Sequence, residues 1–224
     1  MLSEDQVDAF VSRYVKDGQV VSIGTNQLGE LFLKKLGLWC EQNKWNVEII
    51  PTSTSQISTA NQFHLPLTTL NDREVDVAIE FATQADHDYD FIKGNTTSLI
   101  RDKMIAQSAG ELIVVVPAAN MYDKLKGMVP YEISAFGWKR TLLMLEQVGR
   151  VDFTKYETEP PKTELGHYIV ETEMDDHLLI DEMDQQARLI PGVLETGFFI
   201  GSADRILMVG DQEIKVKSRM EYGK

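Results

Sequence analysis

The sequence predicts an α/β fold, in which a Rossmann-like, largely parallel sheet carries helices on both faces and a small α+β domain is inserted. Two observations indicate this. Over the first 126 residues, short apolar segments alternate with segments of helical period, which is typical of right-handed βαβ units. The alternation stops near residue 128, and strand-like segments return near residue 198. We therefore expect a Rossmann-like domain formed by residues 1–127 and 198–224, with residues 128–197 as the inserted domain.

The N-terminal part supplies the first two strand–helix units. Residues 4–16 place their apolar side chains on one stripe, which predicts an amphipathic helix. The apolar segment 20–24 predicts a strand that ends at a glycine, and residues 28–40 follow with helical period. Residues 47–51 predict a second strand. The Thr/Ser segment after it can cap a helix that runs through residues 58–63.

The remaining segments complete the sheet and fill the insertion. Residues 75–80 and the fully apolar residues 111–117 predict strands, with a helix over residues 98–109 between them. The insertion lacks βαβ regularity, which favours an α+β arrangement. Its expected helices span residues 139–148 and 181–189, and its expected strands span residues 167–172 and 178–181. C-terminal strands are expected at residues 196–200, 205–209 and 213–216, with a turn at residues 210–212.

Composition excludes several classes of partner. The formal net charge of −13 argues against nucleic acid, because phosphate neutralisation needs clustered Lys and Arg. No apolar run approaches the roughly 20 residues that span a bilayer, and the acidic N-terminus does not resemble a secretory signal. The single cysteine, Cys40, rules out an intrachain disulfide and fits a reducing compartment. We therefore expect a cytoplasmic protein that binds neither nucleic acid nor membrane.

The residues that could carry chemistry lie near the expected strand ends. Lys93 and Gly94 form a turn that can aim a cation and backbone N–H groups at an anion. Asp102 follows about two helical turns later, where a carboxylate could move a proton. Gly24 ends the first strand and Glu80 the third, and ligands bind outside the carboxyl ends of parallel strands. Taken singly, each residue also has an ordinary structural explanation, such as a solvated lysine or a carboxylate near a helix start.

No cofactor site is expected. The four histidines show no metal-ligand spacing with one another or with Cys40, and the chain has no Walker loop, dinucleotide fingerprint or Ser-His-Asp elbow. The histidines are His64, His87, His167 and His177. The segment from Asp86 to Asp90 could attract a cation, but we interpret it as an acidic surface loop.

Taken together, the motifs resemble those of the type A ribose-5-phosphate isomerase family over nearly the whole chain. The similar segments are Val20 to Thr25, Asp76 to Ile79, Phe91 to Gly94, Leu99 to Ala106 and Ile190 to Asp204. The resemblance implies interconversion of ribose 5-phosphate and ribulose 5-phosphate through an enediolate, without a metal or an organic cofactor. It also implies a small-molecule sugar phosphate as the ligand and a homodimer or homotetramer as the assembly.

The resemblance also assigns the site residues. Lys93 matches the lysine that stabilises developing charge, and Asp102 matches the carboxylate that shuttles the proton, where the family has Glu. The residues matched to substrate binding are Gly24, Thr25, Asn26, Glu80, Thr83, Gly94, Asn95 and Thr96. Gln84 is expected to line the same cleft.

Several matched positions differ from the family pattern. The phosphate loop has lost a glycine and two hydroxyl groups, and two of the three glycines after Lys93 are replaced. Three hypotheses follow from this. The chain is an active sugar-phosphate isomerase, or a catalytically impaired paralogue that binds a ligand or regulates, or an isomerase for a different, less charged sugar.

Overall fold

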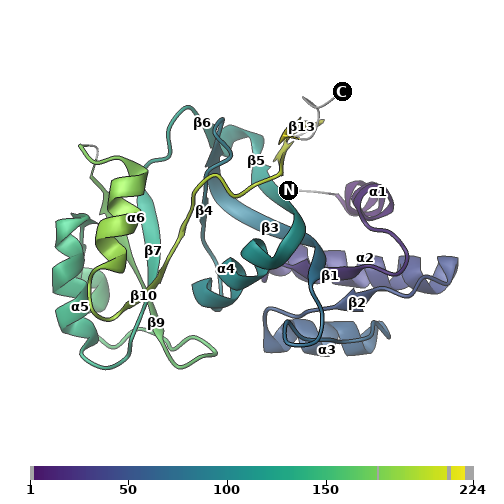
Figure 1. Ribbon diagram of the computed structural model, residues 1–224, viewed down its shortest axis with the longest axis horizontal. Helices are drawn as coiled ribbons and strands as arrows, with labels where there is room; N and C mark the ends of the chain where they lie inside the picture. The colour runs from purple at the N-terminus through teal and green to yellow at the C-terminus, as the bar shows by residue number, and fades with distance from the viewer. Residues whose placement is uncertain (1–2, 176, 211–212, 220–224) are drawn as a thin grey trace.

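The computed structural model describes residues 3–175, 177–210 and 213–219 and contains two sheets. In the large sheet the strands follow the order β11-β4-β3-β5-β12-β13, with β1 and β6 paired to β3, and β2 paired to β1 (Figure 1). Its strands are β1 (Val20–Ile23), β2 (Glu48–Ile49), β3 (Val75–Asp86), β4 (Phe91–Lys93), β5 (Ala109–Pro117), β6 (Met121–Tyr122), β11 (Phe198–Phe199), β12 (Arg205–Val209) and β13 (Ile214–Ser218). Strand β3 pairs parallel with β1, β5 and β6, and the pairs β1–β2 and β5–β12 are also parallel. The pairs β3–β4, β4–β11 and β12–β13 are antiparallel.

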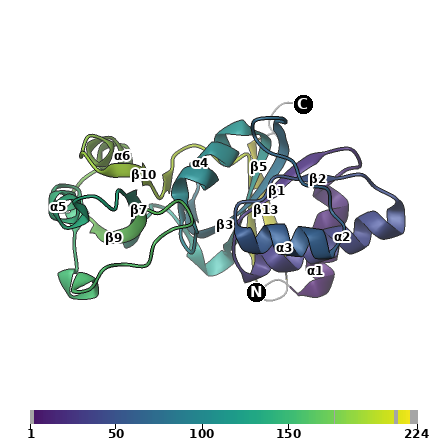
Figure 2. The same cartoon turned by 90° about the horizontal axis from the view of Figure 1, so that it is seen from below.

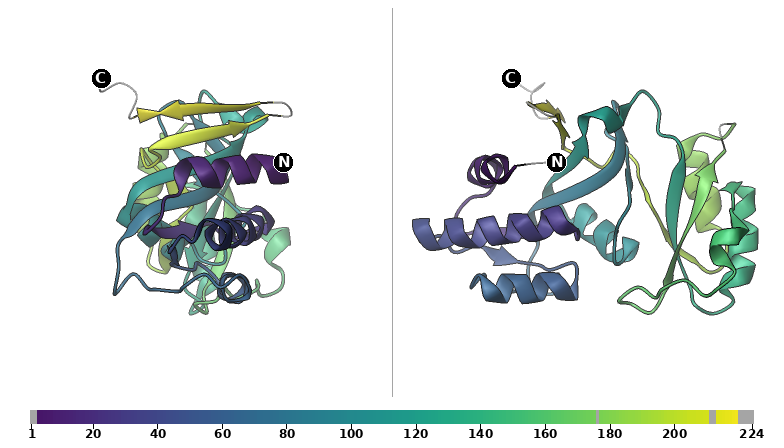
Figure 3. Two further views of the ribbon diagram at one scale, coloured as in Figure 1. Left: turned by 90° about the vertical axis from the view of Figure 1, so that its right-hand side faces the viewer. Right: turned by 180° about the vertical axis from the view of Figure 1, so that it is seen from behind.

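Helices cover both faces of the large sheet. The helices are α1 (Glu4–Tyr14), α2 (Gln27–Asn43), α3 (Thr54–Gln62) and α4 (Leu99–Ser108). Side chains alternate along β3, so that Val77 and Ile79 join the apolar core shared with α1 and α2, whereas Ala78 joins the core shared with α4. Figure 2 shows α2 and α3 together at the end of the molecule far from the small sheet, and Figure 3 shows α1 beside β12 and β13.

The small sheet is antiparallel, with strand order β10-β7-β9-β8. Its strands are β7 (Met128–Ile133), β8 (Gly149–Arg150), β9 (Tyr168–Met174) and β10 (Val193–Thr196), accompanied by α5 (Trp138–Met144) and α6 (Ile180–Arg188). Three 3-10 helices are η1 (Ala118–Asn120), η2 (Leu145–Gln147) and η3 (Phe153–Tyr156). A separate apolar cluster lies under this sheet. Since all four strands fall between residues 128 and 196, we propose the division into domains expected from the sequence.

The α/β class is confirmed, and a few element predictions are wrong. The third strand continues to Asp86 rather than ending at residue 80. Residues 178–179 are not a strand, because they form the approach to α6. The strand expected over residues 196–200 is two strands separated at Gly197. Of the turn at residues 210–212, only Gly210 lies within the described residues.

The segment Asp86 to Asp90 is not an ordinary surface loop. Asp86 and Asp90 are buried, and each carboxylate accepts backbone N–H groups: Asp86 from Asp88 and Asp90, and Asp90 from Gly201. These carboxylates therefore close the turn between β3 and β4.

None of the helices in the described ranges combines the length and the apolar character that a membrane crossing requires.

Candidate active site

A cleft of about 680 Å³ opens at the carboxyl ends of β1, β5 and β12, beside Phe81 and Ala82 in the middle of β3. One side of it is the start of α2, and the opposite side is the loop between β4 and α4. The lining residues are Thr25, Asn26, Gln27, Leu28, Phe81, Ala82, Asn95, Thr96, Thr97, Val115, Val116, Pro117 and Val209. Phe81 is part of the wall and packs edge-on against Phe32, with ring centroids 5.8 Å apart.

Directly behind the cleft lies a buried group of charges, the Lys93 cluster, which consists of Glu80, Lys93 and Asp102. The Lys93 ammonium forms an ion pair with the Glu80 carboxylate, and its Nζ lies 3.4 Å from Oδ2 of Asp102. Each of the three residues is only 1% exposed. Lys93 and Asp102, matched to catalysis from the sequence, therefore lie side by side in the interior and do not face solvent.

The sheet register explains why Glu80 and Lys93 meet. β4 pairs antiparallel with β3, and Lys93 stands opposite Ala82. Glu80 is two residues before Ala82, so both side chains emerge on the same face of the sheet. That face is covered by α4, whose first turn carries Asp102. Two strands and one helix thus place the three charged side chains next to one another.

Burial and mutual attraction set the protonation states of the Lys93 cluster. Burial raises the pKa of the Glu80 carboxyl to about 7, although the Lys93 ammonium acts in the lowering direction. For Lys93, burial acts to lower the pKa, but Asp102 and Glu80 outweigh it and hold the pKa above the ordinary value of 10.5. The ammonium is therefore charged at neutral pH, whereas Glu80 can carry or release a proton.

The loop before α4 orients Asp102. The Thr96 hydroxyl donates a hydrogen bond to Oδ2 of Asp102 and accepts one from the Ser98 backbone N–H at 3.0 Å. Ser98 is the N-cap of α4, and its hydroxyl accepts from the Arg101 backbone N–H. Thr96 also lines the cleft, so one hydroxyl connects the cleft with the buried carboxylate.

A second buried carboxylate holds the same helix from the other side. Glu132 of β7 is fully buried and accepts hydrogen bonds from the Ser98 hydroxyl and the Ile100 backbone N–H, both at 3.0 Å. Its other oxygen lies 2.9 Å from Nδ1 of His167 and 3.4 Å from the Thr163 hydroxyl. We call these five residues the Glu132 cluster. It fixes the start of α4 to the small sheet.

Two close backbone approaches shape the site. A Cβ on Gly24 would lie 2.9 Å from Nζ of Lys93, so only glycine leaves room for the cluster. A Cβ on Gly94 would lie 2.5 Å from Cγ2 of Thr83. The next residue, Asn95, has φ of +50°, a left-handed conformation that Asn adopts more readily than other non-glycine residues. Asn95 therefore adopts a backbone geometry that glycine favours.

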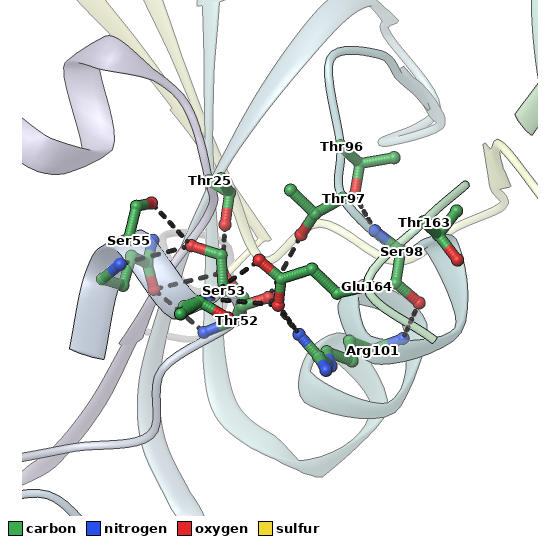
Figure 4. A network of polar contacts seen from close by, with 12 residues as sticks. Thr25, Thr52, Ser53, Ser55, Thr96, Thr97, Ser98, Arg101, Thr163 and Glu164 are labelled. Atoms are coloured by element: carbon green, nitrogen blue, oxygen red, sulfur yellow. Dashed lines mark hydrogen bonds and ion pairs between the residues drawn. The ribbon is translucent and has the colours of Figure 1, made fainter. Parts of the chain in front are cut away.

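Threonines form the polar side of the cleft (Figure 4). Thr25 shares a hydrogen bond of 2.7 Å with the Thr52 hydroxyl, and the backbone carbonyl of Thr52 accepts from Thr97 and Arg101. Arg101 in turn donates to Glu164 at 2.7 Å, and Glu164 also accepts from the backbone N–H of Thr54 at 3.0 Å. Figure 4 shows Glu164 between Arg101 and the start of α3, which ties the loop before β9 to the large sheet.

Most of the residues expected from the sequence lie around the cleft or its buried cluster. Thr25, Asn26, Asn95 and Thr96 line the cleft, whereas Gly24, Glu80 and Gly94 lie at or beside the cluster. Asn26 is the N-cap of α2, and its side chain accepts the Gly29 backbone N–H at 2.8 Å.

Two expected residues do not line the cleft. The Thr83 hydroxyl donates to the Ile92 carbonyl, and Gln84 bonds the backbone of Lys126. Gln84 was therefore placed wrongly, because β3 continues past Glu80 and carries these side chains away. Glu132 was not predicted as a site residue, although a lone carboxylate inside the apolar segment Val129 to Ile133 was a signal for it. Across the described residues, no three His, Cys, Asp or Glu side chains are grouped as a metal site would require.

Comparisons with known proteins show which family this chain resembles. The sequence profile of the family described as ribose 5-phosphate isomerase A (phosphoriboisomerase A) matches residues 48–213. "Ribose-5-phosphate isomerase A 1" of Oceanobacillus iheyensis is 31% identical over 206 residues, which cover 91% of this chain and 92% of that protein. The protein from Methanoregula boonei is 32% identical, covering 89% of this chain and 86% of its own length.

Solved structures show the same similarity. Ribose 5-phosphate isomerase A from Methanocaldococcus jannaschii superposes with a TM-score of 0.83 and 26% identity, over 96% of this chain and 98% of that chain. A D-ribose-5-phosphate isomerase in complex with phospho-erythronic acid gives a TM-score of 0.84 and 25% identity, over 96% and 97% of the two chains.

Proposed function

This chain belongs to the ribose 5-phosphate isomerase A family, and from that premise we propose that it catalyses aldose–ketose isomerisation of a pentose through an enediolate. The interconversion of ribose 5-phosphate and ribulose 5-phosphate is the reaction to test first, because it is the one that the relatives' names give. The observation that carries the proposal is the placement of a lysine and a carboxylate, 3.4 Å apart, behind one cleft.

In the proposed reaction, the Asp102 carboxylate takes the proton from C2 of the open-chain aldose. The electrons of the C2–H bond form the C1=C2 double bond, and the carbonyl oxygen on C1 becomes an oxyanion beside the Lys93 ammonium. Asp102 then returns the proton to C1 while the C2 hydroxyl loses its proton, which leaves a ketone at C2. Glu80, with a pKa of about 7, is suited to carry the oxygen-bound proton between the two positions.

Access to Asp102 must come through the loop after Lys93. The Thr96 hydroxyl bonds the Asp102 carboxylate and also lines the cleft. A substrate hydroxyl that replaces it would keep the carboxylate hydrogen-bonded and bring C2 within reach. In this proposal, residues 94–97 adjust when the substrate enters, and Lys93 and Glu80 stay in place.

A second candidate function is ligand binding without turnover, as in a regulatory paralogue. It is favoured by the burial of the Lys93 cluster, because each of its three residues is only 1% exposed. Such a protein would bind a sugar in the cleft without bringing C2 to Asp102.

The test is to incubate the protein with ribose 5-phosphate in D2O and follow both ribulose 5-phosphate formation and deuterium, at C1 of the ribulose 5-phosphate and at C2 of the recovered ribose 5-phosphate. We expect both signals, and we expect Asp102→Asn and Lys93→Ala to remove them, since proton transfer by a positioned group contributes about 10²–10⁴-fold. Deuterium exchange without isomerisation would support Asp102 as the base and contradict the role of Lys93 in stabilising the oxyanion. Binding of the sugar without exchange, in a correctly folded protein, would contradict the proposal and favour the second candidate.

A further inference from the structure

The charge and polarity of the residues that line the cleft indicate which kind of sugar it can bind. Among the residues the structure describes, none that lines the cleft carries a charge. The polar lining consists of threonine hydroxyls and the side-chain amides of Asn26, Gln27 and Asn95, and the remaining lining is apolar. The apolar lining residues are Leu28, Phe81, Ala82, Val115, Val116, Pro117 and Val209.

Lys93 and Arg101, two cations beside the cleft, are already paired. The Lys93 ammonium is buried between Glu80 and Asp102, which together carry more negative charge than it can neutralise when both are ionised. The Arg101 guanidinium is held by the Glu164 carboxylate and the Thr52 carbonyl. A dianionic group in the cleft would therefore face neutral partners within a chain whose formal net charge is −13.

The first turn of α2 carries a carboxylate, Glu30, and no cationic side chain. Its N-cap, Asn26, uses its side chain to accept the Gly29 N–H and its carbonyl to accept the Glu30 N–H. A hydrogen bond between a cationic side chain and an anion is worth roughly ten- to a hundredfold in affinity, and no lining residue offers a cation. The apolar wall, by contrast, gains from contact with a CH3 or CH2 group.

We infer that the cleft selects an uncharged pentose, one that carries no phosphate at C5, over its 5-phosphate. This inference rests on the proposed function, because it names the substrate class of the same site. In this arrangement the C1–C2 end of the sugar approaches Asp102 through Thr96, and the C5 end lies against the apolar wall. The threonine hydroxyls bond the secondary hydroxyls between them.

The decisive experiment compares 5-deoxy-D-ribose with D-ribose 5-phosphate. Neither sugar can close to a pyranose, because the oxygen at C5 is missing in one and esterified in the other. Their open-chain fractions are therefore matched, which free ribose would not provide. We expect kcat/KM for 5-deoxy-D-ribose to exceed that for ribose 5-phosphate by about tenfold or more. A ratio of one or less overturns the inference and leaves the proposed isomerisation intact.

Calorimetry on the Asp102→Asn variant separates binding from chemistry. We expect 5-deoxy-D-ribose to bind about tenfold more tightly than ribose 5-phosphate. If the unmodified protein turned over neither sugar, the proposed function would fail, and this affinity order would still decide the substrate's charge. Tighter binding of the phosphate, or no binding of 5-deoxy-D-ribose, overturns the inference.

A matched pair of variants tests the cause. Gln27 lines the cleft, is exposed and lies in the first turn of α2. Gln27→Lys places a cation at the cleft, so the ratio of kcat/KM for ribose 5-phosphate to that for 5-deoxy-D-ribose should rise about tenfold. Gln27→Glu should lower the same ratio. Equal ratios in the two variants would show that charge at the cleft does not set the preference.

Discussion

The Lys93 cluster and the Glu132 cluster both bury a glutamate, but they neutralise it in different ways. Glu80 is 1% exposed and faces an ammonium and a second carboxylate. Glu132 is fully buried and faces a hydroxyl, a backbone N–H and an imidazole. Burial is thus the same in both, whereas the partners are charged in one and mostly neutral in the other.

This difference assigns the clusters to different tasks. Three interacting charges can redistribute a proton, and the raised pKa of Glu80 places that event near neutral pH. A carboxylate that accepts fixed neutral donors at a helix start has a defined geometry and holds its neighbours. Both act on α4, since Ser98 and Ile100 belong to its first turn and Asp102 follows directly. One cluster therefore moves protons, and the other sets where Asp102 stands.

The largest effect is expected when the Lys93 cluster loses its cation. Lys93→Met leaves Glu80 and Asp102 buried together without compensation, which should cost about 3–5 kcal/mol of unfolding free energy at pH 8. Protonation of Glu80, whose pKa is raised to about 7, relieves this cost, so the loss should be smaller at pH 5. Urea denaturation at the two pH values measures it.

Lys35→Met is the control for Lys93→Met. Lys35 also contacts two carboxylates, Glu4 and Asp8, but they lie at the surface, with side chains 67% and 41% exposed. Its replacement should change stability little at either pH. If Lys93→Met were equally destabilising at pH 5 and pH 8, uncompensated charge would not be the cause.

Glu80→Gln should remove one pH-dependent contribution to stability. The pKa of Glu80 is raised from the ordinary 4.5 to about 7 in the folded protein. The folded state then binds more protons than the unfolded state between these values. This contribution is complete below the unfolded pKa and is lost as pH rises through the folded pKa, on the order of 3 kcal/mol in total.

Denaturation curves of the wild type and Glu80→Gln between pH 4.5 and 8 test this sign. We expect the wild type to lose stability relative to the variant as pH rises across that window. Asp76→Asn is a control from the same strand, because Asp76 lies outside the Lys93 cluster and accepts the Val20 backbone N–H. A difference between wild type and Glu80→Gln that is constant with pH would contradict the raised pKa.

Glu132→Gln should lower activity by shifting Asp102. The amide keeps the shape but weakens the hydrogen bonds to Ser98 and Ile100, so the free energy of unfolding should fall by about 1–2 kcal/mol. A shift of Asp102 near 1 Å can cost about 100-fold in rate, and we expect kcat to fall at least tenfold with KM little changed.

The controls for Glu132→Gln are Glu132→Asp and Glu195→Gln. Glu132→Asp keeps the charge with a shorter reach and should retain part of kcat. Glu195 belongs to the same sheet but pairs with Arg188 and Lys103, so its amide should leave kcat less affected. An equal loss in kcat for Glu132→Gln and Glu195→Gln would remove the positioning role.

The contrast between the clusters also shows what a sequence can predict. Lys93 and Asp102 were expected to converge because parallel strands end at one edge of the sheet, and local period placed both beside that edge. Glu132 could not be placed, because its contacts to Ser98 span 34 positions and join two sheets whose relative position no local pattern sets. Gln84 was misplaced because β3 continues, past an irregularity near Ala82, beyond the point where its apolar pattern fades.

The smallest effect is expected at the exposed contact between the two sheets. The side chains of Arg101 and Glu164 are 32% and 28% exposed, so Glu164→Gln should cost below about 1 kcal/mol, and salt should reduce the loss. Partial burial acts to raise the pKa of Glu164, but the Thr54 N–H and Arg101 outweigh it and lower the pKa. Its contribution to stability is therefore present above the ordinary pKa of 4.5 and disappears as pH falls through the lowered value.

Denaturation at low and high salt distinguishes this screened surface pair from Glu132, because the stability lost in Glu132→Gln should not depend on salt. A salt-independent loss above 2 kcal/mol for Glu164→Gln would instead place Glu164 with the buried carboxylates, as a fixed part of the frame that holds α4.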